Sequence, residues 1–112
     1  MERQHTDVAA LLADDLNGNF KLFVTSYQPT IYAFLLRQTG NVYDAEDMAQ
    51  EAFIQAYYAL VDYPVQRRRT LTLRQWLYKI ALNIFYNLLH IGRTFYTNAI
   101  ETNEKVTWTP FL

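Results

Sequence analysis

The chain contains no cysteine, so a disulfide framework, a thiolate metal site and a cysteine nucleophile are all excluded. Glycine and proline are scarce, with 3 of each among 112 residues, and a disordered, collagen-like or repeat protein would have a different composition. Serine occurs only at Ser26, and no glycine-rich phosphate loop, catalytic triad spacing or metal-ligand motif is present. We therefore expect no enzyme activity and no cofactor, and no metal site of a recognisable motif.

Long hydrophobic runs are also missing. The apolar run near the N-terminus, Val8–Ala13, is far shorter than the roughly 18 residues that a membrane span requires, and its flanks are not those of a signal peptide. We expect a soluble, cytoplasmic protein with no membrane partner. Hydrophobic residues nevertheless make up 51% of the chain, which at this length predicts a single domain with its own core.

Acidic residues are absent from Tyr63 to Thr97, although the net charge of the whole chain is only -1. Up to Asp62 the chain carries nine acidic and three basic residues, a net charge of -6, and the remainder carries seven basic and two acidic residues, a net charge of +5. Such segregation in a small domain indicates two unlike partners, one of them basic and the other a polyanion.

Apolar residues recur at helical spacing along most of the chain, and no stretch alternates as a half-buried strand does. The pattern predicts an all-α fold, a compact bundle of three main helices preceded by a short N-terminal helix. We expect a helical domain over residues 1–94 and a tail or linker over residues 95–112, which packs through Trp108 and Phe111. The expected helices are Asp7–Leu16, Phe20–Gln38, Asp44–Val61 and Thr72–Ile91.

Local signals predict the ends of these helices. Asn17-Gly18-Asn19 is expected to stop the short helix and to start the next one, and Pro29 to kink or break that second helix near Tyr27 and Gln28. The carboxylate of Asp44 is expected to cap the third helix. A loop from Tyr63 to Leu71, with three consecutive arginines, leads to the last helix, whose inward positions are Trp76, Leu77, Ile80, Ala81, Ile84 and Leu88.

The third helix carries an acidic face. Asp47 and Glu51 lie four residues apart on one side, Gln50 lies beside them, and no cation stands at a matching spacing. Like charges at this spacing lower the stability of a helix by a few tenths of a kcal/mol, so we looked for a role that the pair could have. From the residues alone, three interpretations are open: a solvated helix start, a docking face for a basic partner, or a metal site formed by Asp44, Glu46, Asp47 and Glu51.

Two segments resemble a known family. Asp44–Phe53, with the sequence DAEDMAQEAF, resembles the second conserved region of bacterial RNA polymerase sigma factors, in particular of the extracytoplasmic-function (ECF) group. Further along, Thr72–Asn83 resembles the following helix of that group, in which a small polar cap precedes a Trp-Leu pair and an Ile-Ala-x-Asn run. The two motifs occur in the order and at the spacing of the family, and the resemblance spans Phe20–Arg93.

The resemblance implies a role for the acidic face. In the family, the Asp, Gln and Glu of this helix bind a basic coiled coil on the clamp-bearing largest subunit of core RNA polymerase. The matching positions here are Asp47, Gln50 and Glu51, with Asp44 at the start of the helix. The resemblance also implies an anti-sigma factor as a possible regulatory partner.

The resemblance further implies that the basic half holds the melted non-template strand of the promoter minus-ten element, with one base turned out into a pocket. Arginine and lysine can neutralise phosphates, and Tyr63 or Tyr78 could stack on an unpaired base for about 1–3 kcal/mol. A basic loop is equally compatible with plain solvation. The expected DNA-binding residues are Tyr63, Arg67, Arg68, Arg69, Arg74, Gln75, Tyr78, Lys79, Asn83, Asn87 and His90.

The chain departs from the family pattern along the last helix. Members of the family commonly carry charged residues where this chain has Leu82, Asn87 and His90. We therefore expect a sigma factor domain that binds core polymerase and recognises or melts the minus-ten element. We keep two alternatives: a sigma-like protein-interaction module that has lost DNA recognition, and a small helical enzyme that uses the four acidic residues of the third helix around a divalent metal.

Overall fold

The computed structural model describes residues 7–94, with side chains up to residue 88. The described residues form helices and connecting turns and contain no strand, which confirms the predicted all-α fold. The predicted tail, residues 95–112, lies outside the described residues, and so do the side chains of His90 and Arg93. The helices are α1 (Val8–Asp14), α2 (Leu16–Thr39), α3 (Val42–Asp62), α4 (Val65–Arg69) and α5 (Leu73–Thr94).

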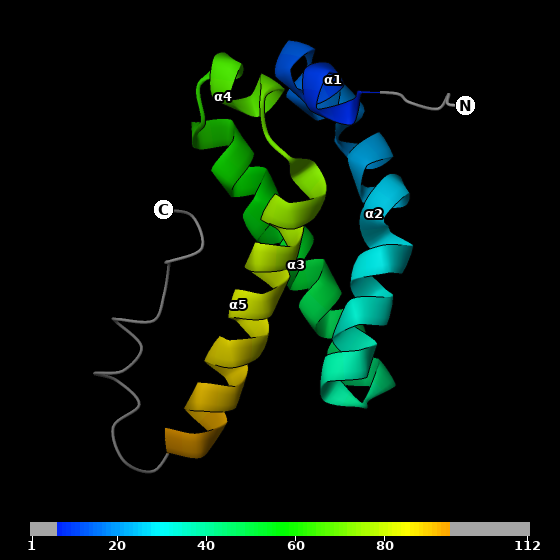
Figure 1. Cartoon of the computed structure of the whole chain (residues 1–112), viewed down its shortest axis with the longest axis vertical. Helices are drawn as coiled ribbons and strands as arrows, with labels where there is room; N and C mark the ends of the chain where they lie inside the picture. Colours follow the sequence, from blue (N-terminus) through cyan, green and yellow to red (C-terminus); the bar gives the residue numbers. More distant parts are fainter. Residues whose placement is uncertain (1–6, 95–112) are drawn as a thin grey trace.

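Three long helices form the body of the structure (Figure 1). Helix α3 packs against both α2 and α5, and the two short helices α1 and α4 pack against each other at the end of the bundle where α2 begins. The inward face of α3 is buried along most of its length and is rich in alanine, which allows the neighbouring helices to approach closely. Its buried residues are Ala45, Met48, Ala49, Ala52, Phe53, Ala56 and Leu60.

Phe23 of α2 lies at the centre of the core and is fully buried. Its ring centroid lies 5.6 Å from that of Phe53 in α3 and 6.4 Å from that of Trp76 in α5, so one side chain contacts all three long helices. Tyr27 also lies against it, at 5.4 Å. Aromatic pairs at these separations contribute beyond their buried area, by about 0.5–1.5 kcal/mol each.

Replacing Phe23 with alanine is therefore expected to lower the free energy of unfolding by about 3–5 kcal/mol, because it opens a cavity where three helices meet. Urea denaturation followed by circular dichroism measures this loss. Replacing Leu22, which is 39% exposed beside it on α2, is the control and should cost less than about 1 kcal/mol. Equal losses for the two variants would contradict the central role of Phe23.

The connection between α1 and α2 differs from the prediction. The stop signal expected at Asn17–Asn19 is wrong, because α1 ends at Asp14 and these residues form the first turn of α2. Asp15 caps α2, since its Oδ1 accepts a hydrogen bond from the Gly18 N–H at 3.0 Å. A Cβ atom at Gly18 would overlap the Asp15 carboxylate, so a side chain at that position would require the carboxylate to shift. Asn19 then joins the two helices by donating to the carbonyl of Leu11 at 2.9 Å.

Pro29 does not break α2, which is continuous from Leu16 to Thr39. Proline removes the backbone hydrogen bond to the carbonyl four residues earlier, here that of Thr25. Both Thr25 and Pro29 are exposed, so water can satisfy the freed carbonyl. Phe23 and Ile31 are buried on either side of this turn and hold the helix against the core.

Helix α3 starts earlier than predicted. Gly40 adopts a left-handed conformation, with φ of 68°, and ends α2. Asn41 is then the N-cap of α3, because its side chain accepts a hydrogen bond from the Asp44 N–H at 3.0 Å. The predicted capping by Asp44 is therefore wrong. Its carboxylate still lies in the first turn, where its negative charge interacts favourably with the positive end of the helix dipole.

The second half of the described chain also differs from the prediction. The segment expected to be a loop contains α4, which carries all three consecutive arginines. Helix α5 continues through Gly92 to Thr94, and Leu88, expected to face the core, is 48% exposed. No helix within residues 7–94 combines the length and apolar character needed to cross a membrane.

Candidate functional site

The predicted polymerase-binding residues lie together on the outer side of α3. Asp44, Asp47, Gln50 and Glu51 are all exposed. Glu51 accepts a hydrogen bond from Gln55 Nε2 at 3.0 Å, which holds its carboxylate along the helix. Helix α3 contains no lysine or arginine, so its negative charge is not neutralised within the helix. This surface suits a basic partner.

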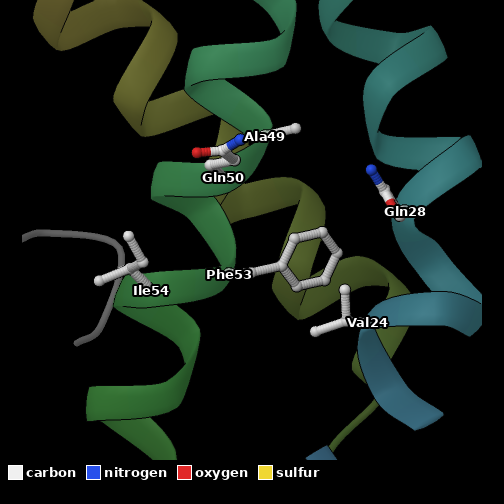
Figure 2. Close-up of a pocket in the computed structure, with 6 residues that line it drawn as sticks. All are labelled: Val24, Gln28, Ala49, Gln50, Phe53 and Ile54. Carbon is white, nitrogen blue, oxygen red and sulfur yellow. The ribbon is translucent and has the colours of Figure 1, made fainter. Parts of the chain in front are cut away.

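Two shallow grooves flank this acidic ridge. On the α2 side, Phe53 points toward Val24 across the space between the helices, while Gln50 and Ile54 stand at the rim on α3 (Figure 2). The remaining lining residues of this groove are Gln28 and Ala49. On the α5 side, the second groove is lined by Asp47, Met48, Glu51, Gln55, Ile84, Asn87 and Leu88. A partner on α3 would therefore meet a ridge with a depression on each side.

The acidic residues of α3 do not converge as metal ligands would. Within the described part of the chain, no three histidine or carboxylate side chains lie close enough together to hold a metal ion. The helix distributes Asp44, Glu46, Asp47 and Glu51 around its exposed surface. The arrangement of these four carboxylates in the structure therefore does not support the metal-site interpretation.

The three consecutive arginines of α4 have different surroundings. Arg68 donates from Nη1 to the carbonyl oxygen of Leu12 at 3.3 Å, at the C-terminal end of α1. Arg69 forms an ion pair with Asp14 at 2.9 Å. Arg67 instead lies over the ring of Tyr63, with 4.1 Å between its guanidinium carbon and the ring centroid. Two of the three arginines therefore attach α4 to α1.

The two tyrosines expected to stack on a base are both half-buried. The hydroxyl of Tyr63 accepts a hydrogen bond from Trp76 Nε1 at 3.2 Å, and Arg67 covers one face of its ring. The ring of Tyr78 packs against Phe34 of α2, at 4.9 Å between centroids. Each ring thus already has an intramolecular contact, which restricts the ring surface available for stacking on a base.

The remaining predicted DNA-binding residues are distributed around α5. Arg74, Gln75 and Lys79 are exposed, Asn83 is half-buried, and His90 lies on the helix with a side chain outside the described set. Asn87 lines the groove that also contains Asp47 and Glu51. The structure therefore places Asn87 beside the predicted polymerase-binding residues and away from Arg74, which lies on the opposite flank of α5 at about 100° per residue.

The sequence interpretation missed an apolar stripe. Tyr58 is 66% exposed, and Ile54 and Val61 on the same side of α3 are 50% and 51% exposed. Tyr57, in contrast, is half-buried and donates a hydrogen bond to Asn17 Oδ1 at 2.7 Å. The signal was in the sequence, because Ile54, Tyr58 and Val61 follow Asp47 and Glu51 at alternating intervals of four and three residues.

Comparison with known proteins identifies the family. The family model of Sigma-70 region 2 matches residues 23–91, which extend from Phe23 of α2 into α5. The chain therefore belongs to the Sigma-70 region 2 family, as the resemblance of its two motifs predicted. No solved structure matches it.

Curated relatives agree with this assignment. The chain is 42% identical over 65 residues to the ECF RNA polymerase sigma factor SigW of Bacillus subtilis, which covers 58% of this chain and 33% of SigW. It is 40% identical over 70 residues to the RNA polymerase sigma-H factor of Pseudomonas aeruginosa, covering 62% of this chain and 34% of that protein. With the sigma factor YlaC of B. subtilis, identity is 31% over 85 residues, covering 76% and 47%. The chain thus spans about a third of the length of the first two relatives.

The different surroundings of the α4 arginines lead to a stability prediction. Arg68→Met should lower the free energy of unfolding by about 1–2 kcal/mol, because the Leu12 carbonyl loses a partly buried, charge-assisted hydrogen bond. Arg67→Met removes the same charge from the same helix and should cost less than about 1 kcal/mol, the value of an exposed cation–π contact. Thermal melts of both variants measure the difference, and a larger loss for Arg67→Met would contradict it.

Proposed function

We propose that this chain is a sigma factor domain that binds core RNA polymerase through the outer face of α3 and holds the melted non-template strand of the promoter minus-ten element along α4 and α5. The observation that carries the proposal is the separation of charge within a Sigma-70 region 2 fold. Helix α3 carries acidic residues and no basic ones, whereas α4 and α5 carry basic residues and no acidic ones.

The α3 face has the properties of a docking surface for a basic coiled coil. Asp47 and Glu51 are exposed on neighbouring turns, and Gln50 beside them lines the α2–α3 groove. Complementary charges of this kind speed association and fix the register of a complex. The sigma factor relatives support core RNA polymerase as the partner.

Binding of the chain to core polymerase tests this docking surface. Glu51→Lys should weaken binding by about tenfold or more, because it places a cation against a basic partner, and Gln50→Ala should weaken it less. Asp62→Lys makes the same charge change at an exposed position eleven residues beyond Glu51, at the other end of α3, so it should alter binding by less than about threefold. Failure of the wild-type chain to bind would refute the proposal.

Only some of the basic residues of α4 and α5 are free to bind a nucleic acid. Arg74 and Lys79 are exposed on α5 and form no ion pair with any described residue. Arg67 presents its guanidinium on top of Tyr63, where it can contact a phosphate or stack on an unpaired base. Arg68 and Arg69 are already bound to α1. We therefore assign phosphate binding to Arg67, Arg74 and Lys79.

Salt-dependent binding to a single-stranded oligonucleotide with the non-template minus-ten sequence tests this assignment. Arg74→Ala and Lys79→Ala should each weaken binding and lower the slope of log K against log salt by about 0.7, the value for one phosphate contact on a single strand. Lys21→Ala removes an exposed cation from α2 and should leave the slope unchanged. A slope unaffected by Arg74 and Lys79 would contradict the assignment.

A second function is favoured by the α1–α4 contact. Because Arg68 and Arg69 bind α1, and Leu82 and Asn87 are uncharged, the basic surface is weaker than the sequence suggests. A sigma-like module that binds polymerase or a regulatory protein such as an anti-sigma factor, without recognising DNA, fits this observation. Polymerase binding that persists when the oligonucleotide does not bind at low salt would favour this function.

A further inference from the structure

The outer face of α3 carries a continuous line of residues opposite the core. We call Asp47, Glu51, Ile54, Tyr58 and Val61 the outer seam. At about 100° per residue, these positions lie within roughly 40° of a single line along the helix. The buried alanines Ala45, Ala52 and Ala56 lie on the far side of the same helix. The outer seam is therefore the part of α3 that points most directly away from its own domain.

Apolar side chains at these positions need an explanation. A helix on a protein surface normally carries charged or polar residues opposite its buried stripe. Here Ile54, Tyr58 and Val61 are 50%, 66% and 51% exposed, and they occupy successive turns. Isolated exposed hydrophobic residues are common, but a stripe of adjacent ones marks an interaction surface.

The spacing of the outer seam indicates the shape of its partner. The intervals between its members are four, three, four and three residues, which is the repeat that places side chains along the contact line of two packed helices. A flat or irregular partner would not require this repeat over four turns. The seam therefore fits another helix that runs alongside α3.

The charge of the seam specifies that helix further. Its first two members are acidic and its last three are apolar. A complementary helix would carry lysine or arginine opposite Asp47 and Glu51, and apolar side chains opposite Ile54, Tyr58 and Val61. The groove beside Gln50 and Ile54 offers a recess for one of those apolar side chains.

We propose that the outer seam is one continuous helix-packing surface, and that the polymerase coiled coil which binds the acidic half also packs on the apolar half through Ile54, Tyr58 and Val61. This proposal rests on the proposed function, because it takes the partner of the acidic residues as the partner of the whole seam. The proposal adds an apolar contact to the charge contact made by Asp47 and Glu51. The partner's helix must therefore carry apolar side chains next to the basic segment that meets these two carboxylates.

Titration of the chain with core polymerase tests the apolar half. Ile54→Ala and Tyr58→Ala should each raise Kd by about fivefold or more, the usual effect of truncating an important interface side chain. Leu22→Ala on α2 and Tyr86→Ala on α5 are matched controls, since these residues are 39% and 54% exposed elsewhere on the surface. Both controls should bind within about twofold of the wild type. Thermal melts of all four variants verify that they are folded.

Salt concentration separates the two halves of the seam. The loss of binding caused by Glu51→Gln should shrink as salt rises, because salt screens exposed charges. The loss caused by Ile54→Ala should persist at high salt, since it arises from apolar burial. A loss for Ile54→Ala that disappears at high salt would contradict a packed apolar contact.

The outcomes distinguish this proposal from the one on which it rests. If the wild-type chain binds polymerase and Glu51→Lys abolishes binding, while Ile54→Ala and Tyr58→Ala bind as tightly as the wild type, the apolar half is not part of the interface and the proposal is overturned. If the wild-type chain does not bind at all, the proposed function fails first. If the free chain sediments as a dimer that Ile54→Ala dissociates, a second copy covers the seam and the proposal is overturned.

Discussion

The ring of Phe23 fixes the relation between the long helices, and the external surfaces depend on it. Its contacts with Phe53 and Trp76 join α2 to α3 and to α5. Because Phe53 must face Phe23, the rotation of α3 about its own axis is set, and with it the direction of Asp47 and Glu51. A surface residue on a helix has a defined orientation only when the opposite face is packed in one way.

The sequence predicted most of the fold because the fold depends on helical periodicity. Five of the six positions expected to face inward on the last helix are buried: Trp76, Leu77, Ile80, Ala81 and Ile84. The errors occurred where a local signal competes with tertiary contacts. Pro29 lies in a continuous helix with Phe23 and Ile31 buried on either side of it, and Gly18 lies inside α2, where its N–H donates to the Asp15 cap.

The residues of the candidate site could be predicted from the sequence. Which of their side chains are free to meet a partner could be predicted only in part. The exposure of Asp47, Gln50 and Glu51 follows from their positions opposite the core of α3. The attachment of Arg68 and Arg69 to α1 could not be predicted, because it joins residues more than 50 positions apart in the chain. The outer seam could have been found, since its spacing is visible in the sequence once the core face of α3 is assigned.

The contact between α1 and α4 bears on how the basic surface meets an anion. The guanidinium group of Arg68 donates a hydrogen bond to the Leu12 carbonyl, and that of Arg69 donates one to the Asp14 carboxylate. A phosphate that approached these two side chains would have to displace oxygen atoms that the protein already supplies. Helix α1, which lies before the region matched by the family model, therefore supplies the oxygen atoms that Arg68 and Arg69 contact, and under the proposed function it would compete with a phosphate for these two arginines.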